Sequence, residues 1–314
     1  MSYHQARGQR IPWEALPASV RDAVETGLGT KVVGATTQPG GMSPGVAARL
    51  ELADGNRAFV KAVGSEPNPY SPGMHRREAE VAAALPAEAP APRLLFAHDD
   101  GNWVALVFED VEGHQPAVPW RPDELERVLA ALTDLAEALT PAPVAAPTAA
   151  DYLAELFGGW SQLAQQGGAE GVDPWATARL DELARLEAGW AEASIGETLL
   201  HADVRSDNVL LTEERVVFVD WPHACLGAAW LDLAGFLPSL AMQGGPRPWE
   251  VFEAHPLGRN APLERVLPLI AAFAGFFVQR STLPPPPGLA TLREFQRAQS
   301  VEALAWLRRS LGES

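Results

Sequence analysis

The sequence changes character once, near Glu109–Gly113, and this change limits the folds that the chain can adopt. Most of the strand-like segments lie before it, and most of the chain after it has helical periodicity. Runs of strands followed by runs of helices are typical of α+β proteins. We therefore expect two lobes, residues 1–110 and residues 111–314.

The first lobe is predicted to hold a small antiparallel sheet with one packed helix. Strands are expected at residues 31–37, 47–52, 57–62, 93–97 and 103–109, after an amphipathic helix at residues 14–28. The Asp-Gly pair at residues 54–55 indicates a hairpin between the second and third strands. The helical segment 73–85 ends before Pro86 and is the helix that we expect to pack on the sheet.

The second lobe is predicted to be mostly helical. Helices are expected at residues 122–139, 151–165 and 174–193, and further helical segments continue to the end of the sequence. A short strand-rich block at residues 198–220 interrupts them. The composition, 47% hydrophobic and 20% charged, is that of an ordinary globular protein with a sizeable core.

The net charge of −16 opposes nucleic-acid binding, which needs a basic surface. The same charge could draw in a cationic substrate or merely keep the protein soluble. A single cysteine, Cys225, excludes an internal disulfide framework and a multi-cysteine metal site. The longest apolar run, residues 266–278, is too short to cross a bilayer, and the first ten residues are polar. We expect a cytoplasmic enzyme, monomeric or homodimeric, that binds neither nucleic acid nor membranes.

Residues 198–236 carry the most informative pattern. Asp203 follows His201 by two positions and precedes Asn208 by five, and Asp220 ends the apolar segment VVFVD. Phosphoryl transfer from a nucleotide needs a group that orients the acceptor hydroxyl, and oxygen ligands for Mg²⁺. Asp203 suits the first role, whereas Asn208 and Asp220 suit the second. The alternative is that Asp203 and Asp207 are turn residues and that Asp220 caps a strand.

This segment resembles the catalytic and metal-binding loops of the aminoglycoside phosphotransferase family, which is related to choline kinases and more distantly to protein kinases. The family's His-Gly-Asp-x-x-x-x-Asn pattern corresponds here to HADVRSDN, with Ala202 in place of the glycine, and its Ile-Asp-Trp block corresponds to VDW. The resemblance implies a two-lobed protein kinase-like fold. It also implies that Asp203 is the catalytic aspartate and that Asn208 and Asp220 bind magnesium.

Two further residues acquire structural roles from the resemblance. His201 would orient the catalytic loop. Asp232, in the LDLA stretch that the family also carries, would brace that loop.

The resemblance also assigns a nucleotide-binding role to Lys61 on the third expected strand. Lys61 would hold the phosphates of the nucleotide, and Glu78 in the REAE stretch would pair with it. Glu80 is an alternative partner on a different face of the helix. The family pattern favours Glu78.

Two loops complete the expected nucleotide site. The turn PGGMSPG could form a phosphate loop through Gly40, Gly41, Ser43 and Gly45, because glycines permit close approach of backbone N–H groups to phosphates. It could also be a plain hairpin loop. The segment FEDVEG resembles the family's hinge, with Glu109, Asp110 and Val111 at the nucleotide base. It could also be an ordinary inter-domain linker, and the two interpretations are compatible.

These residues predict an ATP-dependent, or GTP-dependent, O-phosphotransferase that uses Mg²⁺. The expected acceptor is a hydroxyl of an antibiotic such as an aminoglycoside. A kinase of choline, an amino alcohol or a sugar is the alternative, followed by an inactive kinase-like binding protein. Few acidic residues follow Asp232, and the run 266–278 is apolar. Both features favour an acceptor that has sizeable non-polar parts or carries at most one positive charge.

Overall fold

A computed structural model describes residues 10–38, 45–66, 69–286 and 289–313, which form two compact units. The first, called here the sheet unit, comprises residues 10–115 and Asp207–His223. The second, called here the helical unit, comprises Pro116–Ser206 and residues 224–313. The division of functions between residues 1–110 and 111–314 stays a prediction.

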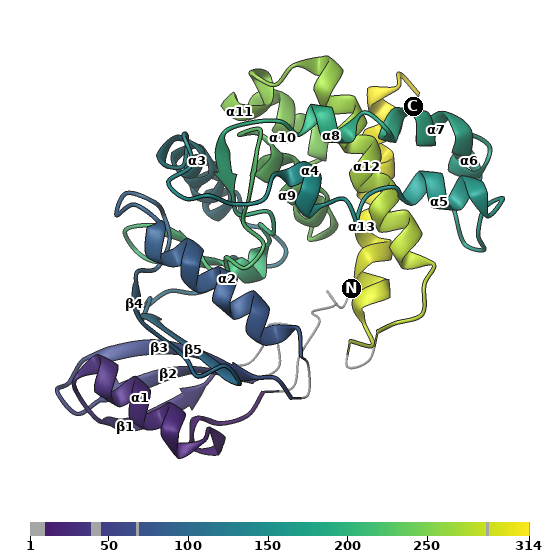
Figure 1. Ribbon diagram of the computed structural model, residues 1–314. Coiled ribbons are helices and arrows are strands. Elements are labelled where there is room, and N and C mark those ends of the chain that lie inside the picture. The colour runs from purple at the N-terminus through teal and green to yellow at the C-terminus, as the bar shows by residue number, and fades with distance from the viewer. Residues whose placement is uncertain (1–9, 39–44, 67–68, 287–288, 314) are drawn as a thin grey trace. The chain divides into compact units, whose positions relative to one another are not determined.

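The sheet unit is built on the predicted antiparallel sheet, now seen to have five strands in the order β1-β2-β3-β5-β4 (Figure 1). The strands are β1 (Val32–Thr37), β2 (Val46–Leu52), β3 (Arg57–Gly64), β4 (Leu94–Asp99) and β5 (Trp103–Glu109). The hairpin between β2 and β3 is confirmed. Its Gly55 has a left-handed φ of 85°, and the N–H of Leu52 donates to the carbonyl of Asn56 at 3.0 Å.

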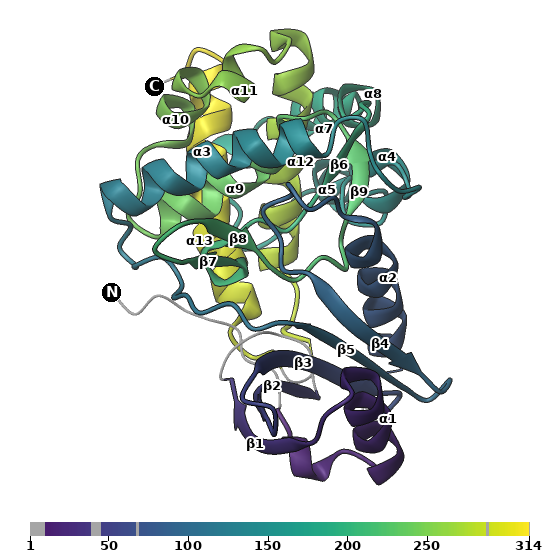
Figure 2. The same cartoon turned by 90° about the vertical axis from the view of Figure 1, so that its left-hand side faces the viewer.

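Helices cover both faces of this sheet. Helix α1 (Ala18–Leu28) packs on the face that presents Ala58 and Val60 of β3, and helix α2 (Ser71–Ala84) packs on the opposite face, which presents Phe59 (Figure 2). The expected packed helix is thus α2. Because successive side chains of a strand point to opposite faces, Lys61 lies on the α2 face with Phe59.

A distant stretch of chain completes the sheet unit. Strands β7 (Val209–Leu211) and β8 (Val216–Phe218) form a second hairpin. A β-bridge joins Leu211 to His114, and the N–H of Phe218 donates to the carbonyl of Pro90 at 2.7 Å. The segment Asp207–His223 therefore belongs to the same body as the five-stranded sheet.

Apart from two short 3-10 helices, Trp13–Ala15 and Ser206–Asn208, the remaining elements belong to the helical unit. Its helices are α3 (Pro122–Ala138), α4 (Ala149–Tyr152), α5 (Gly159–Gln165), α6 (Pro174–Thr177), α7 (Leu180–Glu187), α8 (Trp190–Ala193), α9 (Leu231–Met242), α10 (Pro248–Ala254), α11 (Pro256–Arg259), α12 (Leu263–Ser281) and α13 (Leu292–Ser310). Strands β6 (Thr198–Leu200) and β9 (Cys225–Gly227) pair antiparallel. Helices α12 and α13 pack side by side (Figure 1). No helix in the described part of the chain is both long and apolar enough to cross a membrane.

Two predicted helices are divided in the structure. The segment 151–165 contains the end of α4 and all of α5, separated by a turn in which Gly158 has a left-handed φ of 100°. A left-handed residue cannot continue a right-handed helix, so the helical pattern is broken there. The segment 174–193 likewise contains three short helices, α6, α7 and α8, where one was expected.

One buried carboxylate holds the start of α5. Glu187, at the end of α7, is 1% exposed and accepts hydrogen bonds from the N–H groups of Gly158 (3.2 Å), Trp160 (3.1 Å) and Ser161 (3.2 Å). Burial raises the pKa of Glu187 from 4.5 to about 7, although these donors favour the charged form. The carboxyl group of the folded protein therefore keeps its proton to a higher pH than in the unfolded chain.

This difference predicts a pH-dependent stability. Between pH 4.5 and 7 the folded state binds more protons at Glu187, so the free energy of unfolding falls as pH rises. The loss is about 3 kcal/mol at 1.36 kcal/mol per pKa unit. We expect the stability difference between wild type and Glu187→Gln to change by about this amount between pH 4.5 and 8 in urea unfolding. Glu182→Gln on the exposed side of α7 is the control, and a similar change there would contradict the assignment.

Candidate active site

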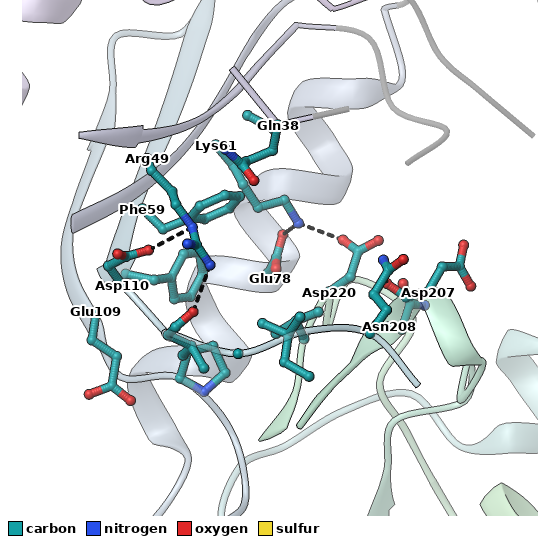
Figure 3. Close-up of a pocket in the computed structure, with 18 of the residues that line it drawn as sticks. Gln38, Arg49, Phe59, Lys61, Glu78, Glu109, Asp110, Asp207, Asn208 and Asp220 are labelled. Carbon is teal, nitrogen blue, oxygen red and sulfur yellow. Dashed lines mark hydrogen bonds and ion pairs between the residues drawn. The ribbon is translucent and has the colours of Figure 1, made fainter. Parts of the chain in front are cut away.

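The sheet unit contains a pocket of about 380 Å³, and all of its lining residues belong to that unit (Figure 3). The lining residues come from β2, β3, α2, the end of β5 and the segment after it, and the segment 207–220, together with Arg10, Gln38 and Pro92. Of the predicted site residues, the pocket brings together Lys61, Glu78, Glu109, Asp110, Val111, Asn208 and Asp220. The predicted residues His201, Asp203 and Asp232 lie in the helical unit.

Lys61 lies between two carboxylates at one end of the pocket (Figure 3). Its Nζ is 2.6 Å from Oε2 of Glu78 and 2.5 Å from Oδ1 of Asp220. Glu78 is 2% exposed on the sheet-facing side of α2, whereas Glu80 is exposed to solvent. Glu78 is therefore the partner of Lys61 in this structure.

Burial and charge set the protonation of this cluster. Burial acts to lower the pKa of Lys61, but the negative charges of Asp220 and Glu78 outweigh it and raise that pKa. Burial raises the pKa of Glu78, opposed by the charge of Lys61. His75 of α2 is also buried, and burial together with the charge of Lys61 lowers its pKa to about 3. With Lys61 charged and both carboxylates ionised, the cluster carries one net negative charge.

Asn208 and Asp220 supply oxygen atoms to the same end of the pocket, where Figure 3 shows them side by side. The N–H of Val219 donates to the backbone carbonyl of Asn208 at 2.9 Å and keeps the two segments together. Asp220 has a left-handed φ of 72°, a conformation that few non-glycine residues adopt. Such conformations cluster at functional sites, where the surrounding structure holds them in place.

The donor set fits a magnesium ion. Mg²⁺ prefers oxygen ligands and is usually held by one or two carboxylates together with nucleotide phosphates. Asp220 and Asn208 offer a carboxylate and an amide oxygen. Within the described residues, no group of three or more His, Cys, Asp or Glu side chains forms a metal cage. Phosphate and water oxygens would therefore complete the coordination.

The hinge segment lies at the other end of the pocket, with its side chains engaged in ion pairs. The carboxylate of Asp110 is 5% exposed and contacts Arg57 at 2.8 Å and Arg49 at 3.2 Å. Arg49 also donates to the backbone carbonyl of Val111 at 2.9 Å. The side chain of Glu109 pairs with Arg93 and Arg215, which lie outside the pocket.

Of the predicted phosphate loop, Gly40, Gly41 and Ser43 lie outside the described residues. Gly45 has a left-handed φ of 103°, and a Cβ atom there would collide with the carbonyl oxygen of Ala62. Only glycine fits this position. The loop's role in phosphate binding stays a prediction.

In the helical unit, Asp232 holds the backbone of the loop that carries Asp203. Its carboxylate accepts hydrogen bonds from the N–H groups of His201 and Ala202, each at 2.8 Å. The imidazole Nδ1 of His201 accepts from the N–H of Asp203 at 3.2 Å. The guanidinium of Arg205 donates to Oδ1 of Asp203 at 2.7 Å. The two residues assigned to loop support thus contact the loop backbone directly.

Ala202, which stands where the resembling family has glycine, has a left-handed φ of 60°. This conformation costs an alanine roughly 1–2 kcal/mol and glycine almost nothing, whereas glycine loses about 0.5–1 kcal/mol more backbone entropy on folding. We expect Ala202→Gly to raise the free energy of unfolding by up to about 1 kcal/mol in chemical denaturation. Ala130→Gly, the same change at an exposed position within α3, should lower it by about 1 kcal/mol. Equal losses in both variants would contradict the expectation.

Several functional candidates escaped the sequence analysis. Arg49 and Phe59 line the pocket because alternation along β2 and β3 places them on the same face as Lys61. The alternation of side chains along the two strands can be read from the sequence. The sequence of a hairpin does not show, however, which of its two faces lines a pocket. Arg205 is two residues from Asp203, but the sequence does not show that the two side chains pair. Arg10 also lines the pocket, from a segment with no recognisable motif.

Solved structures that align with this chain include aminoglycoside phosphotransferases and a choline/ethanolamine kinase family protein. The aminoglycoside phosphotransferase APH(4)-Ia aligns with a TM-score of 0.59 and 16% identity, over 94% of this chain and 98% of that chain. A choline/ethanolamine kinase family protein from Mesorhizobium loti aligns with a TM-score of 0.60 and 16% identity, over 94% and 97%. An aminoglycoside phosphotransferase from Alicyclobacillus acidocaldarius aligns with a TM-score of 0.54 and 17% identity, over 90% and 92%. At these identities the likeness confirms the kinase-like fold.

The family follows from the sequence match. Among curated protein sequences, none matches this chain significantly. The model of the phosphotransferase enzyme family matches residues 44–269, which is more than half of the 314 residues. This range includes the buried Lys61–Glu78 pair, the loop of Asp203, and Asp220. The chain therefore belongs to the phosphotransferase enzyme family.

Proposed function

We propose that this small-molecule phosphotransferase transfers the γ-phosphoryl group of ATP to a hydroxyl group of an antibiotic such as an aminoglycoside. The observation that carries the proposal is the position of Lys61, 2.6 Å from the buried Glu78 and 2.5 Å from Asp220 in a single pocket. A lysine held by a buried carboxylate is a fixed cation, which suits nucleotide phosphates.

The base and the phosphates of a nucleotide would bind at opposite ends of the pocket. The base would lie against the hinge, Glu109–Val111, and the apolar rings of Phe59 and Phe108, all of which line the pocket. Lys61 binds the phosphates at the other end. A solved structure of APH(4)-Ia that shares 15% identity with this chain contains ADP and hygromycin B, which is consistent with a nucleotide donor. GTP is the alternative donor.

Asn208 and Asp220 would hold Mg²⁺ against the phosphates. When bound, the ion neutralises phosphate oxygens and favours departure of the diphosphate. Lys61 then shares its charge between Asp220 and the phosphates, and Glu78 keeps its ammonium group in place.

Asp203 is the residue assigned to the acceptor hydroxyl. Its carboxylate accepts the hydroxyl proton as the oxygen forms its bond to the γ-phosphorus, while the bond between that phosphorus and the bridging oxygen of the nucleotide breaks. ADP leaves with the electron pair of that bond. Asp232 and His201 position the loop through the backbone contacts described above, and Arg205 fixes one carboxylate oxygen of Asp203.

The choice of acceptor rests on charge and on the resemblance. The net charge of −16 attracts cationic molecules, and Asp151 and Glu155 in the helical unit are acidic groups that a polycation could contact. The apolar run 266–278, which suggested an apolar acceptor, lies within α12 and is largely buried in the core. It therefore gives no reason to prefer an apolar acceptor. A kinase of choline, an amino alcohol or a sugar remains the second candidate, favoured by the likeness to the choline/ethanolamine kinase family protein.

A phosphorylation screen tests the proposal. Purified protein is incubated with Mg-ATP or Mg-GTP and a panel of aminoglycosides, choline, ethanolamine and sugars, and the phosphorylated acceptor is detected by mass spectrometry. Transfer to an aminoglycoside that disappears in Asp203→Asn is the expected result. Nucleotide binding without transfer to any hydroxyl compound would instead identify an inactive kinase-like binding protein.

A further inference from the structure

A segment outside the family-matched range contributes to the nucleotide pocket. The family match begins at residue 44, whereas Arg10 and Ile11 lie far before it in the sequence. The N–H of Ile11 donates to the carbonyl of Gly45 at 3.1 Å, and Arg10 forms a parallel β-bridge with the same glycine. These contacts attach the segment to Gly45, the residue that directly precedes β2.

The side chain of Arg10 lines the pocket at the end that holds Lys61. Burial lowers the pKa of Arg10, and the negative charge of Asp220 opposes this shift. The positive charge of Arg10 also acts on His75, which feels the charges of Lys61 and Asp220 as well. The strand register agrees with this position. Gly45, which forms the bridge to Arg10, directly precedes β2, and Ala47 of β2 pairs with Lys61. The hinge begins at Glu109, which pairs with Ala58 near the other end of β3, so Arg10 belongs to the charged cluster and not to the hinge.

Charge complementarity at this end favours an additional cation. Lys61 is already shared by Glu78 and Asp220, so these three groups together carry a negative charge. Arg49, the other arginine at the pocket wall, is held at the hinge by Asp110 and Val111. A nucleoside diphosphate or triphosphate brings several further negative charges, and a guanidinium matches phosphate oxygens with paired N–H donors.

We propose that Arg10 binds the phosphate chain of the donor nucleotide as a second cation beside Lys61. The inference rests on the proposed function of the pocket and extends it. The donor site then includes a residue from a segment that precedes the family-matched range. Arg10 acts as a positioning residue on the phosphates, with Gly45 holding its backbone.

Calorimetric titration of the full chain with adenosine, AMP, ADP and ATP in the presence of Mg²⁺ tests this role. In Arg10→Gln, we expect affinity for ADP and ATP to fall by about 10- to 100-fold, the loss typical of a hydrogen bond to a charged group. Adenosine, which has no phosphate, should bind Arg10→Gln and wild type within about twofold of each other, since Arg10 does not contact the base. Arg10→Lys should fall between wild type and Arg10→Gln, because it keeps the charge and loses the paired donors.

The control is Arg76→Gln, which removes an arginine of the sheet unit. Arg76 pairs with Asp99, and both residues lie outside the pocket. Its ADP and ATP affinities should equal those of wild type. Equal losses of adenosine and ATP binding in Arg10→Gln would mean that Arg10 only supports the shape of the pocket. Unchanged ATP binding would show that Arg10 does not contact phosphates, and tighter ATP binding would show that it blocks their site. A wild-type protein that binds none of the four ligands would overturn the proposed function itself.

Discussion

Replacing Asp220 by asparagine should lower kcat by about 10³-fold or more and remove the Mg²⁺ dependence of ATP binding. The substitution removes the charge that contacts Lys61 at 2.5 Å and replaces the one carboxylate of the expected metal donor pair by a neutral, weaker amide oxygen. Asparagine tolerates the left-handed backbone at this position, so the loop should keep its shape. Steady-state kinetics and calorimetry with and without Mg²⁺ measure the two effects.

Glu214→Gln is the matched control for this experiment. It removes one negative charge from the exposed turn of the β7–β8 hairpin, which also supports Asp220, and lies outside the pocket. Its kcat and Mg-ATP affinity should match those of wild type. Wild-type affinity for Mg-ATP in Asp220→Asn would exclude Asp220 as a metal ligand.

The substitution Asp203→Asn should lower kcat by about 10²–10⁴-fold with little change in nucleotide affinity. This side chain is assigned to the acceptor hydroxyl and lies outside the residues that line the nucleotide pocket. Asparagine keeps the size of the side chain and a possible contact with Arg205, but it cannot accept a proton. Steady-state kinetics with ATP and the phosphorylated acceptor, together with ADP binding by calorimetry, separate the two quantities.

Asp181→Asn, on the exposed side of α7, controls for the loss of one aspartate from the helical unit. Asp207 is less suitable for this purpose, because it lines the nucleotide pocket. If Asp203→Asn and Asp181→Asn showed the same small loss of kcat, Asp203 would be a turn residue, as its local sequence alone allows.

The strands of the sheet unit were predictable because their signals are local. The bounds of β5 agree with the prediction at both ends, and the Asp-Gly turn between β2 and β3 determines the register of that hairpin. Helices α4 to α8 were harder to predict. Gly158, in the break between α4 and α5, has a left-handed φ, and two-residue breaks at 178–179 and 188–189 separate α6, α7 and α8.

For the candidate site, family spacing predicted residues from separate segments that line the same pocket. Asn208, Asp220, Lys61 and Glu78 all line it, and their roles in binding nucleotide and metal stay predictions. The arginines of the pocket could not be found in this way. Arg49 reaches the pocket because β2 pairs with β3, and Arg10 reaches it through a bridge to Gly45, more than thirty residues later in the sequence. Neither contact produces a recognisable motif in the nearby sequence.

The late segment Asp207–His223, which completes the sheet unit, has a consequence for the order of events on the ribosome. Residues 10–115 emerge first, but β7, β8, Asn208 and Asp220 are made only roughly a hundred residues later, about 5–20 s at ordinary rates of synthesis. During that interval Lys61 and Glu78 lack Asp220, and the buried strand Val216–Phe218 has not yet joined their unit. Nucleotide therefore cannot stabilise the nascent sheet unit through Asn208 or Asp220 before the catalytic loop itself has been translated.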